Sequence, residues 1–466
     1  MRRKRIGIIG GGFTGAALAI HLSRNSERPL EIFIFEPRRM LGAGLAYSSS
    51  DPDHRVNGPI DILALFADNL RHFPDWFRTS GEYARDPDSL AKTGQLYCCR
   101  ASFGRYMDWL TRSHAASNPS QSTIDHIECA VRELRPQNGG YGLWCEDGRW
   151  HQVDEVRLCL AHEIPELPSP FASLAGMRTL VENPWNGEAL AEIASDDDIL
   201  VLGTGLTAAD VIASLLRIGH RGRIIAISRR GLRPREQDVL PPVEGRLAKM
   251  GRTVPLFVER HGRSRTITGI LSALRKDLAA AKQSGLGWQD AFDDLRDAAP
   301  ALWATLPSEA RRQALRHLRG LYDVHRFRVA PPIADRIRIA EAEGRVRFVK
   351  ARATAAVASR SGFKVTLQLP GDEAGREFDF AGLVNCTGPQ SDLSRTRNPL
   401  LRRLFEAGTI RADPCQLGID VDADCAVIRA DGRVDPSLRV LGPLTRGHFG
   451  DLIAVPQINS QILRTV

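Results

Sequence analysis

The apolar positions of the chain form the same pattern in two places. Residues 5–10, "RIGIIG", are a short apolar run, and "FTGAALAIHLSR" then carries apolar residues at helical intervals. Residues 199–210, "ILVLGTGLTAAD", repeat this order in the middle of the chain. A buried strand, a glycine turn and a helix open a nucleotide-binding βαβ unit. The pattern therefore predicts two such units.

The first turn has G-x-G-x-x-G spacing at Gly10, Gly12 and Gly15. Gly10 permits the tight turn, Gly12 lets the backbone approach a pyrophosphate, and Gly15 lets the helix lie close to the strand. Phe13 and Thr14 fall at the start of the helix, where free N–H groups and a partial positive charge favour phosphate. The turn is predicted to bind a dinucleotide.

The next apolar run, "LEIFIFE", ends in Glu36, at the distance where an acidic side chain hydrogen-bonds the adenosine ribose. Further along, "MLGAGLAYSSSDPDHRVNGP" contains Gly42 and Gly44. These glycines allow a second backbone approach to a long cofactor such as FAD, or they belong to an ordinary loop. Strand, turn, helix, strand and acid together predict a bound dinucleotide with a free ribose.

The second turn uses Gly203 and Gly205, and Leu206 and Thr207 begin its helix. Ala208 replaces the third glycine, a substitution that this kind of turn permits. The second turn is therefore predicted to hold its own nucleotide.

The strand that follows, "GRIIAISRRG", ends in Ser228, Arg229 and Arg230 and has no carboxylate. Arginine binds a 2′-phosphate with a forked set of donors, so this ending favours NADP(H) over NAD(H). The alternative is that both arginines are solvated surface residues. Asp210, early in the helix, is expected to face solvent or its own helix end, because it would repel phosphates.

Two nucleotides in one chain indicate a hydride relay in which NADPH reduces a flavin. "FDFAGLVNCTGP", with Thr387 and Gly388, reads as a returning crossover strand. "LRVLGPLTRGHFGDLIAVPQINSQI" adds a strand, a turn at Gly442 and a helix. We therefore predict an α/β fold with two Rossmann-like dinucleotide-binding domains. The expected parts are an FAD domain at 1–190 and 350–466, and an NADPH domain at 191–349 with a helical insert at 236–320.

Composition narrows the function classes. The chain has 466 residues and a formal charge of +8, carried by scattered arginines without a nucleic-acid-binding motif. An anionic small molecule would satisfy the same arginines. We expect no membrane span, no signal peptide and no metal, because no long apolar run and no metal-ligand spacing occur. Eight cysteines without a CxxC pair fit a cytoplasmic protein with reduced thiols. The oligomeric state stays open.

The chain resembles the bacterial FAD/NAD(P)-binding oxidoreductases, distant relatives of the flavin N-hydroxylating and Baeyer–Villiger monooxygenases. The resemblance is carried over nearly the full length by "GGGFTGAALA", "GAGLAYSSSDPDHRVNGP", "YCCRASFGRYM", "VLGTGLTAAD", "SRRGLRP", "HRFRVAPPIA", "VNCTGP" and "LGPLTRG". It implies FAD and, commonly, NADPH. The family includes a flavin-dependent urate hydroxylase, although most members have no assigned substrate.

The chain departs from the family at a few positions. Ala161, in "CLAH", stands where the family has a glycine, and Gly442-Pro443 stands where many flavoproteins have Gly-Asp. The Baeyer–Villiger fingerprint and the Cys-x-x-x-x-Cys of disulfide reductases are absent. These departures bear on the substrate more than on the fold.

Flavin monooxygenation needs few reactive side chains, because the protein mainly excludes water and positions the substrate. His54, Asn57 and His448 are candidates for contacts with the flavin or the active site, or for local packing. Arg105 either reaches a phosphate or forms a surface ion pair. His325, Arg326 and Arg328 form a basic cluster that binds an anion or serves packing.

The function predicted from these features is an FAD-dependent, NADPH-consuming oxidoreductase. The predicted reaction is monooxygenation, in which molecular oxygen hydroxylates a small nitrogen-containing or anionic substrate. A flavin reductase or dehydrogenase that passes electrons to another acceptor is the alternative enzyme. A non-catalytic nucleotide-binding protein is the alternative outside enzymes.

Overall fold

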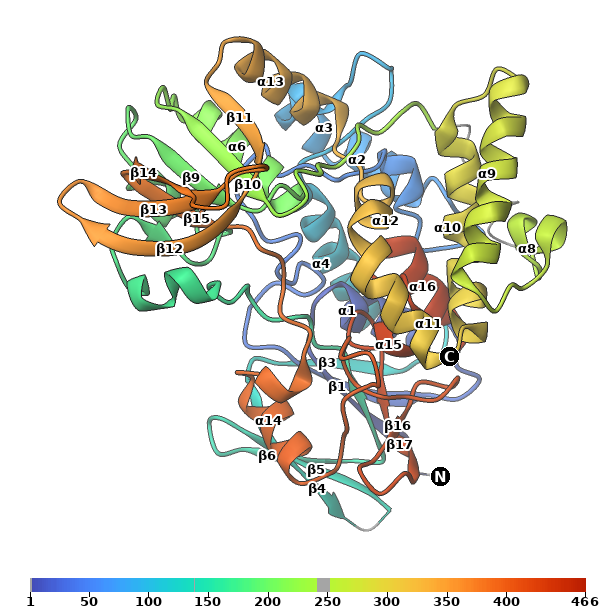
Figure 1. The fold of residues 1–466 in the computed structure, drawn as a ribbon. Helices are drawn as coiled ribbons and strands as arrows, with labels where there is room; N and C mark the ends of the chain where they lie inside the picture. The colour runs from blue at the N-terminus through green and yellow to red at the C-terminus, as the bar shows by residue number, and fades with distance from the viewer. Residues whose placement is uncertain (1, 138, 241–251) are drawn as a thin grey trace.

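The computed structural model describes residues 2–137, 139–240 and 252–466. Its centre is a pair of parallel sheets, one for each predicted nucleotide-binding unit (Figure 1). The first sheet has the order β16-β17-β7-β1-β2-β3, and only the edge strand β16 runs antiparallel to its neighbour. Its strands are β1 (Lys4–Ile9), β2 (Leu30–Phe35), β3 (Thr123–Ile127), β7 (Glu155–Leu158), β16 (Ala426–Ile428) and β17 (Val434–Val440).

The second sheet has the order β11-β10-β9-β15-β8 and is wholly parallel. Its strands are β8 (Leu180–Val181), β9 (Ile199–Leu202), β10 (Ile224–Ser228), β11 (Val346–Lys350) and β15 (Gly382–Asn385). All four residues of β9 are buried, as expected of a central strand covered on both faces. The predicted α/β class and the two Rossmann-like units are confirmed.

A three-stranded antiparallel sheet packs on each parallel sheet. β4 (Val131–Gln137), β5 (Gly140–Cys145) and β6 (Trp150–Val153) share a core with β1 and β7. β12 (Arg352–Ser359), β13 (Gly362–Gln368) and β14 (Arg376–Phe380) share a core with β9 and β15.

The sequence predicts that the NADPH domain ends at residue 349, but strands after this residue still belong with the second sheet. β12–β14 pack on the second sheet and β15 pairs with β9, although this segment is expected to return to the first domain. The strands of the second sheet thus extend to Asn385, and β16 and β17 complete the first sheet. The division into domains stays a prediction, and these pairings favour a later second boundary.

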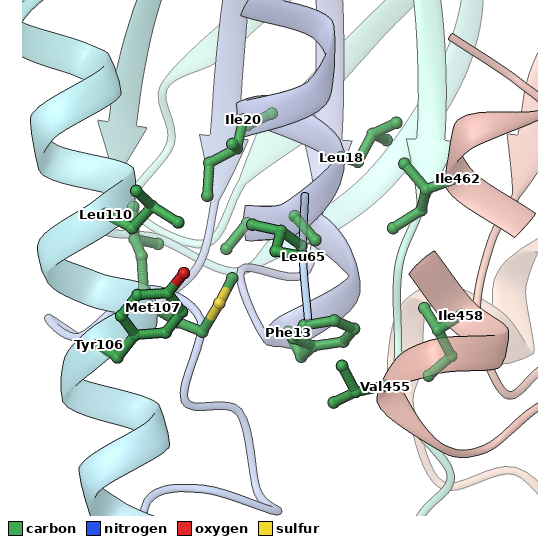
Figure 2. Packing of buried hydrophobic residues seen from close by; sticks show 14 of the residues in the cluster. Phe13, Leu18, Ile20, Leu65, Tyr106, Met107, Leu110, Val455, Ile458 and Ile462 are labelled. Carbon is green, nitrogen blue, oxygen red and sulfur yellow. The ribbon is translucent and has the colours of Figure 1, made fainter. Parts of the chain in front are cut away.

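Helix α1 (Phe13–Asn25) is buried from Phe13 to Ser23 and lies between two other helices, α4 (Arg100–Ala116) and α16 (Val455–Leu463) (Figure 2). Its alanine-rich sequence leaves room for neighbours on every side. Phe13 packs with Val455 and Ile458 in one core cluster, so the C-terminal helix covers the start of α1.

Other short elements complete the two halves. Around the first sheet are η1 (Ile60–Ile62), α2 (His72–Thr79), α3 (Glu82–Arg85), η2 (Pro87–Ser89), η5 (Leu393–Arg395), α14 (Pro399–Glu406) and α15 (Arg446–Phe449). With the second sheet are η3 (Ser169–Leu174), α5 (Gly187–Ala191), α6 (Leu206–Arg217) and α13 (Pro331–Ala342). Among the described residues, no helix is both long and apolar enough to cross a bilayer.

The insert is helical in its described part. It comprises α8 (Leu256–His261), α9 (Ile267–Gln283), α10 (Trp288–Thr305), α11 (Ser308–Gln313), the π-helical turn η4 (Ala314–Leu318) and α12 (Arg319–Arg326). Residues 241–251 of the predicted insert lie outside the described residues. The helices continue beyond the expected end at residue 320, and in Figure 1 they stand beside α15 and α16.

Candidate dinucleotide sites and two cavities

The first turn is held against the end of a neighbouring strand. Gly10 has φ 101°, and a Cβ there would lie 2.6 Å from the carbonyl oxygen of Cys159. A Cβ on Gly15 would lie 2.0 Å from the carbonyl oxygen of Gly10. Both positions therefore require glycine, one for its backbone conformation and one for the close approach of helix to turn.

The second turn repeats this arrangement. Gly203 has φ 120°, and a Cβ there would lie 2.2 Å from the carbonyl oxygen of Cys386. The N–H of Cys386 donates to Leu202, as that of Cys159 donates to Ile9. The two halves of the molecule thus share one arrangement, in which each glycine turn packs against the end of a crossover strand.

Both helix starts offer donors to a phosphate. The described residues supply no acceptor for the N–H groups of Gly12, Phe13 and Thr14, or for those of Leu206 and Thr207. Neither α1 nor α6 has an acidic residue in its first turn. A Cβ on Gly205 would meet nothing within 4 Å. These are the features of a diphosphate cradle, so the residues fit the cofactors that the sequence predicts.

Glu36 lies at the end of β2, but its carboxylate already has partners. It accepts hydrogen bonds from the N–H of Gly11 (3.0 Å) and from the guanidinium of Arg38 (2.8 and 3.0 Å). Burial opposes its ionisation, and the contacts with Arg38 and Gly11 outweigh burial and lower its pKa. A ribose at Glu36 would share the carboxylate with Arg38.

The loop at Gly42 and Gly44 packs on the first turn. A Cβ on Gly44 would lie 3.2 Å from the Cα of Gly12, and one on Gly42 would collide with Met107 at 2.3 Å. Gly42 also donates its N–H to the carbonyl of Gly11. The loop therefore approaches the phosphate turn itself, which fits the predicted second backbone approach to a long cofactor.

A cavity of about 180 Å³ adjoins the second turn at Thr204 and Gly205. The arginines that line it are Arg233, Arg235 and Arg338. Arg233 pairs with Glu341 at 2.6 Å and its guanidinium lies 5.1 Å from the ring of Phe348. An arginine over an aromatic ring beside a nucleotide turn fits the binding of an adenosine 2′-phosphate.

The arginines named by the sequence lie elsewhere. Arg230 is exposed and donates to the carbonyls of Arg316 (2.8 Å) and His317 (3.0 Å) in the insert, and Arg229 is exposed. Ser228 accepts from the hydroxyl of Thr204 at 2.9 Å, and so fixes the turn. Arg233 and Arg235 could have been named as candidates from the sequence, because "SRRGLRPRE" places both a few residues past the end of the strand.

Asp210 does not face solvent as expected. It is buried and pairs with Arg100 at 2.8 Å, which joins α6 to α4. Arg105 pairs with the buried carboxylate of Glu82. Of the two alternatives that the sequence left open for Arg105, the structure shows an ion pair, and a contact with a phosphate stays a prediction.

His54 lies where the two halves meet. Its Nδ1 is 2.6 Å from the hydroxyl of Ser49, and its Nε2 is 3.2 Å from that of Ser214 on α6. Burial lowers its pKa, so the ring is a neutral link between the halves. Asn57 is half-buried in the same loop.

The remaining predicted residues follow the crossover strands. Thr387 donates to the side chain of Asn385 at 2.8 Å, and Gly388 has φ 93°, where an added Cβ would meet nothing within 4 Å. A Cβ on Gly442 would lie 2.7 Å from the hydroxyl of Thr14, which places this turn on the start of α1. His448 is half-buried in α15 and packs on Phe449.

Ala161 causes no backbone strain. Among the described residues other than glycine, positive φ occurs only at Gln121, Gln416 and Cys425. The first crossover segment, at Ala161, therefore has no residue with left-handed backbone at this position, whereas the second crossover segment has Gly388 with positive φ.

A larger cavity, of about 430 Å³, lies between the insert helices and the segment 446–451. Its walls are apolar side chains of α9, α10 and α12, and its charged lining residues are Arg319, Asp323, Arg446 and Asp451. Trp303 joins the two sides, because its Nε1 donates to the carbonyl of Gly447 at 2.9 Å. Arg326 pairs with Asp451 beside this cavity, and Arg328 with Asp293.

All eight cysteines are free thiols, and Cys98 and Cys99 are both buried. Within the described part of the chain, one group of side chains has the spacing of metal ligands: Cys129, Cys145 and Asp147. The carboxylate of Asp147 pairs with Arg149.

Residues 7–163 match the family described as FAD-NAD(P)-binding, which agrees with the predicted resemblance. No curated protein sequence matches the chain. The structure resembles ornithine hydroxylase from Pseudomonas aeruginosa, with 17% identity, 99% of this chain and 98% of that chain covered, and a TM-score of 0.61.

Two further solved structures are similar over the whole chain. The ornithine N-hydroxylase of Kutzneria sp. 744, with reduced FAD, NADP⁺ and L-ornithine, has 15% identity, covers 100% and 98% of the two chains, and gives a TM-score of 0.66. The FAD-bound cadaverine monooxygenase of Erwinia amylovora has 15% identity, coverage of 100% and 94%, and a TM-score of 0.63. At these identities the likeness concerns the fold. Membership alongside a urate hydroxylase stays a prediction.

Proposed function

We propose that this protein is an FAD-dependent, NADPH-consuming monooxygenase that hydroxylates a nitrogen atom of a small molecule. The observation that carries the proposal is the repetition of one phosphate turn in two sheets, with a cavity beside the second turn and a larger cavity between the insert helices and the segment 446–451. The solved structures that the chain resembles act, by their names, on ornithine and cadaverine. Eight free thiols are compatible with a reducing cytoplasm.

The overall reaction balances as follows. One atom of molecular oxygen is inserted into an N–H bond of the substrate, and the other leaves as water. NADPH supplies two electrons and becomes NADP⁺, and one proton is taken up. Bound FAD would accept hydride from NADPH and pass the electrons to oxygen.

The residues of this chain bind and orient the reactants. The first-turn N–H groups of α1, at Phe13 and Thr14, would hold the FAD diphosphate, and Glu36 would contact its ribose. Thr204 and Gly205 would face the NADPH diphosphate, and Arg233 its 2′-phosphate. The apolar insert would exclude water from the larger cavity.

The test uses the purified full-length protein. We expect a yellow protein with flavin absorption bands, NADPH oxidation that depends on oxygen, and a product heavier than its amine by one oxygen atom. A colourless protein that refuses added FAD would favour the non-catalytic alternative. NADPH oxidation that continues without oxygen when an artificial electron acceptor is supplied, with no oxygenated product, would favour the reductase.

A further inference from the structure

The larger cavity has an apolar body. Its walls include Leu271 and Leu274 of α9, Leu295 and Leu302 of α10, and Phe292. Leu271 and Leu274 are only partly buried, and Ala281 is the one buried residue of α9. The apolar face of this helix is therefore turned toward the cavity without filling it, which leaves room for an apolar ligand.

One end of the cavity is polar and has unsatisfied atoms. Asp451 is 7% exposed, and its Oδ2 accepts from the hydroxyl of Tyr322 (3.0 Å) and from Arg326. Its Oδ1 is buried and has no hydrogen-bond partner, and the same holds for Nε of Arg446. Because buried polar atoms are normally paired, an unpaired carboxylate oxygen on a residue that lines a cavity points to a ligand that donates an N–H or O–H.

The charges at this end are nearly balanced. Arg319 pairs with Asp323 and Arg326 with Asp451, while the structure shows no ion pair of Arg446 with a described residue. Both ring nitrogens of His162 are also buried without partners. The surplus is one positive charge, so this end accepts a neutral donor more readily than a second cation.

Chain segments next to the polar end lead toward both nucleotide turns. Asp451 precedes α16, whose first residue, Val455, packs in one cluster with Phe13 beside the first turn (Figure 2). On the other side, Phe327 lines this cavity, while Val329 lines the smaller cavity at Thr204. A ligand with its polar end at Asp451 would present that end to the place where the two cofactors meet.

We propose that the larger cavity binds an amine with an extended apolar or aromatic body, whose neutral nitrogen donates to Oδ1 of Asp451. This proposal rests on the proposed function, because it places the substrate nitrogen at the site of hydroxylation. A diamine or a basic amino acid would put its second charged group among Leu271, Leu274 and Leu295, where the lining offers it no partner.

The experiment compares four probes on the holoenzyme: n-octylamine, cadaverine, octanoate and n-octanol. Binding is followed by isothermal titration calorimetry, and turnover by NADPH oxidation and hydroxylamine formation. We expect octylamine to bind at least tenfold more tightly than cadaverine, and to release about one proton as it binds, because the free amine is protonated near neutral pH. Tighter binding of cadaverine or of octanoate would overturn the proposal.

Two variants locate the binding. Asp451→Asn should weaken octylamine at least tenfold and should weaken octanol as well, because the O–H of octanol would donate to the same oxygen. Leu274→Glu places a carboxylate on the partly exposed wall, and should weaken octylamine and strengthen cadaverine. Leu286→Glu is the matched control, since Leu286 is 57% exposed in the same insert and does not line the cavity. If Asp451→Asn fails to fold, the comparison of Leu274→Glu with its control Leu286→Glu decides whether the amine binds in this cavity.

The outcomes separate this proposal from the proposed function. If octylamine binds and Leu274→Glu reverses the preference, but no hydroxylamine forms, the amine site stands and monooxygenation fails. If another amine is hydroxylated while octylamine neither binds nor stimulates NADPH oxidation, monooxygenation stands and the apolar amine site fails.

Discussion

Arg100 of α4 and Asp210 of α6 form an ion pair with an N–O distance of 2.8 Å, and both side chains are largely buried, at 12% and 7% exposure. The pair joins a helix of the first half to a helix of the second. Arg217 with Asp51 and Arg336 with Asp53 cross the same interface. Ion pairs thus help to fix how the two halves of the molecule pack on each other.

Asp210→Asn should destabilise the protein by about 3 kcal/mol, because it leaves a buried guanidinium without its counter-charge. Urea unfolding measures the loss. Asp196→Asn is the control, since the Asp196–Arg221 pair is 70% and 66% exposed and its loss should leave stability nearly unchanged. Equal effects of the two variants would contradict the structural role of the buried pair.

Gly205→Ala should separate NADPH binding from folding. A Cβ at Gly205 meets nothing within 4 Å, and its φ of −83° suits alanine, so the fold should tolerate the methyl group. The same methyl would stand where a diphosphate must approach the backbone, so the KM for NADPH should rise at least tenfold with unchanged flavin content. Steady-state kinetics measure this, and Gly187→Ala, also in open space, should change nothing. An unchanged KM would remove Gly205 from the cradle.

The sequence allowed the fold and both turns to be predicted because glycine spacing and apolar runs are local signals. Gly10 and Gly203 lie where their backbone must have positive φ, and the pattern alone indicates this. The partners of Asp210 and Glu36 could not be predicted. Arg100 is far from Asp210 in sequence, and ion pairing between them depends on how the halves dock.

The candidate site was only partly predictable for the same reason. Strand pairing decides that β15 joins the second sheet, and residues near it in sequence give no sign of this. The polar end of the larger cavity combines Arg319, Arg446 and Asp451 from distant segments. Only tertiary structure brings such residues together.

Arg233→Ala should reduce the preference for NADPH over NADH at least tenfold. Arg233 lines the cavity beside the second turn, whereas Arg230 is held by two carbonyl oxygens of the insert. A 2′-phosphate bound by Arg233 would replace Glu341 as its partner, so Glu341→Gln should lower the KM for NADPH and leave that for NADH nearly unchanged. Arg230→Ala is the matched control for kcat/KM with the two nucleotides. A loss of preference in Arg230→Ala alone would restore the assignment made from the sequence.

His162 should make the protein less stable in mild acid. Burial, with smaller contributions from Arg446 and Arg319, lowers the pKa of its imidazole from 6.5 to about 3. The unfolded chain then binds a proton that the folded chain does not. The free energy of unfolding therefore keeps the full contribution of neutral His162 above pH 6.5. It declines by about 1.4 kcal/mol per pH unit as the pH falls from 6.5 toward 3.

His162→Phe should remove this decline. Between pH 6.5 and 5 the change in unfolding free energy should be smaller than in the wild type by about 2 kcal/mol, as measured by urea titrations at each pH. His317→Phe, at an exposed site, should leave the slope unchanged. Parallel slopes for the wild type and His162→Phe would mean that the ring of His162 is protonated or solvated in the folded protein. It could then not be a neutral group near Arg446.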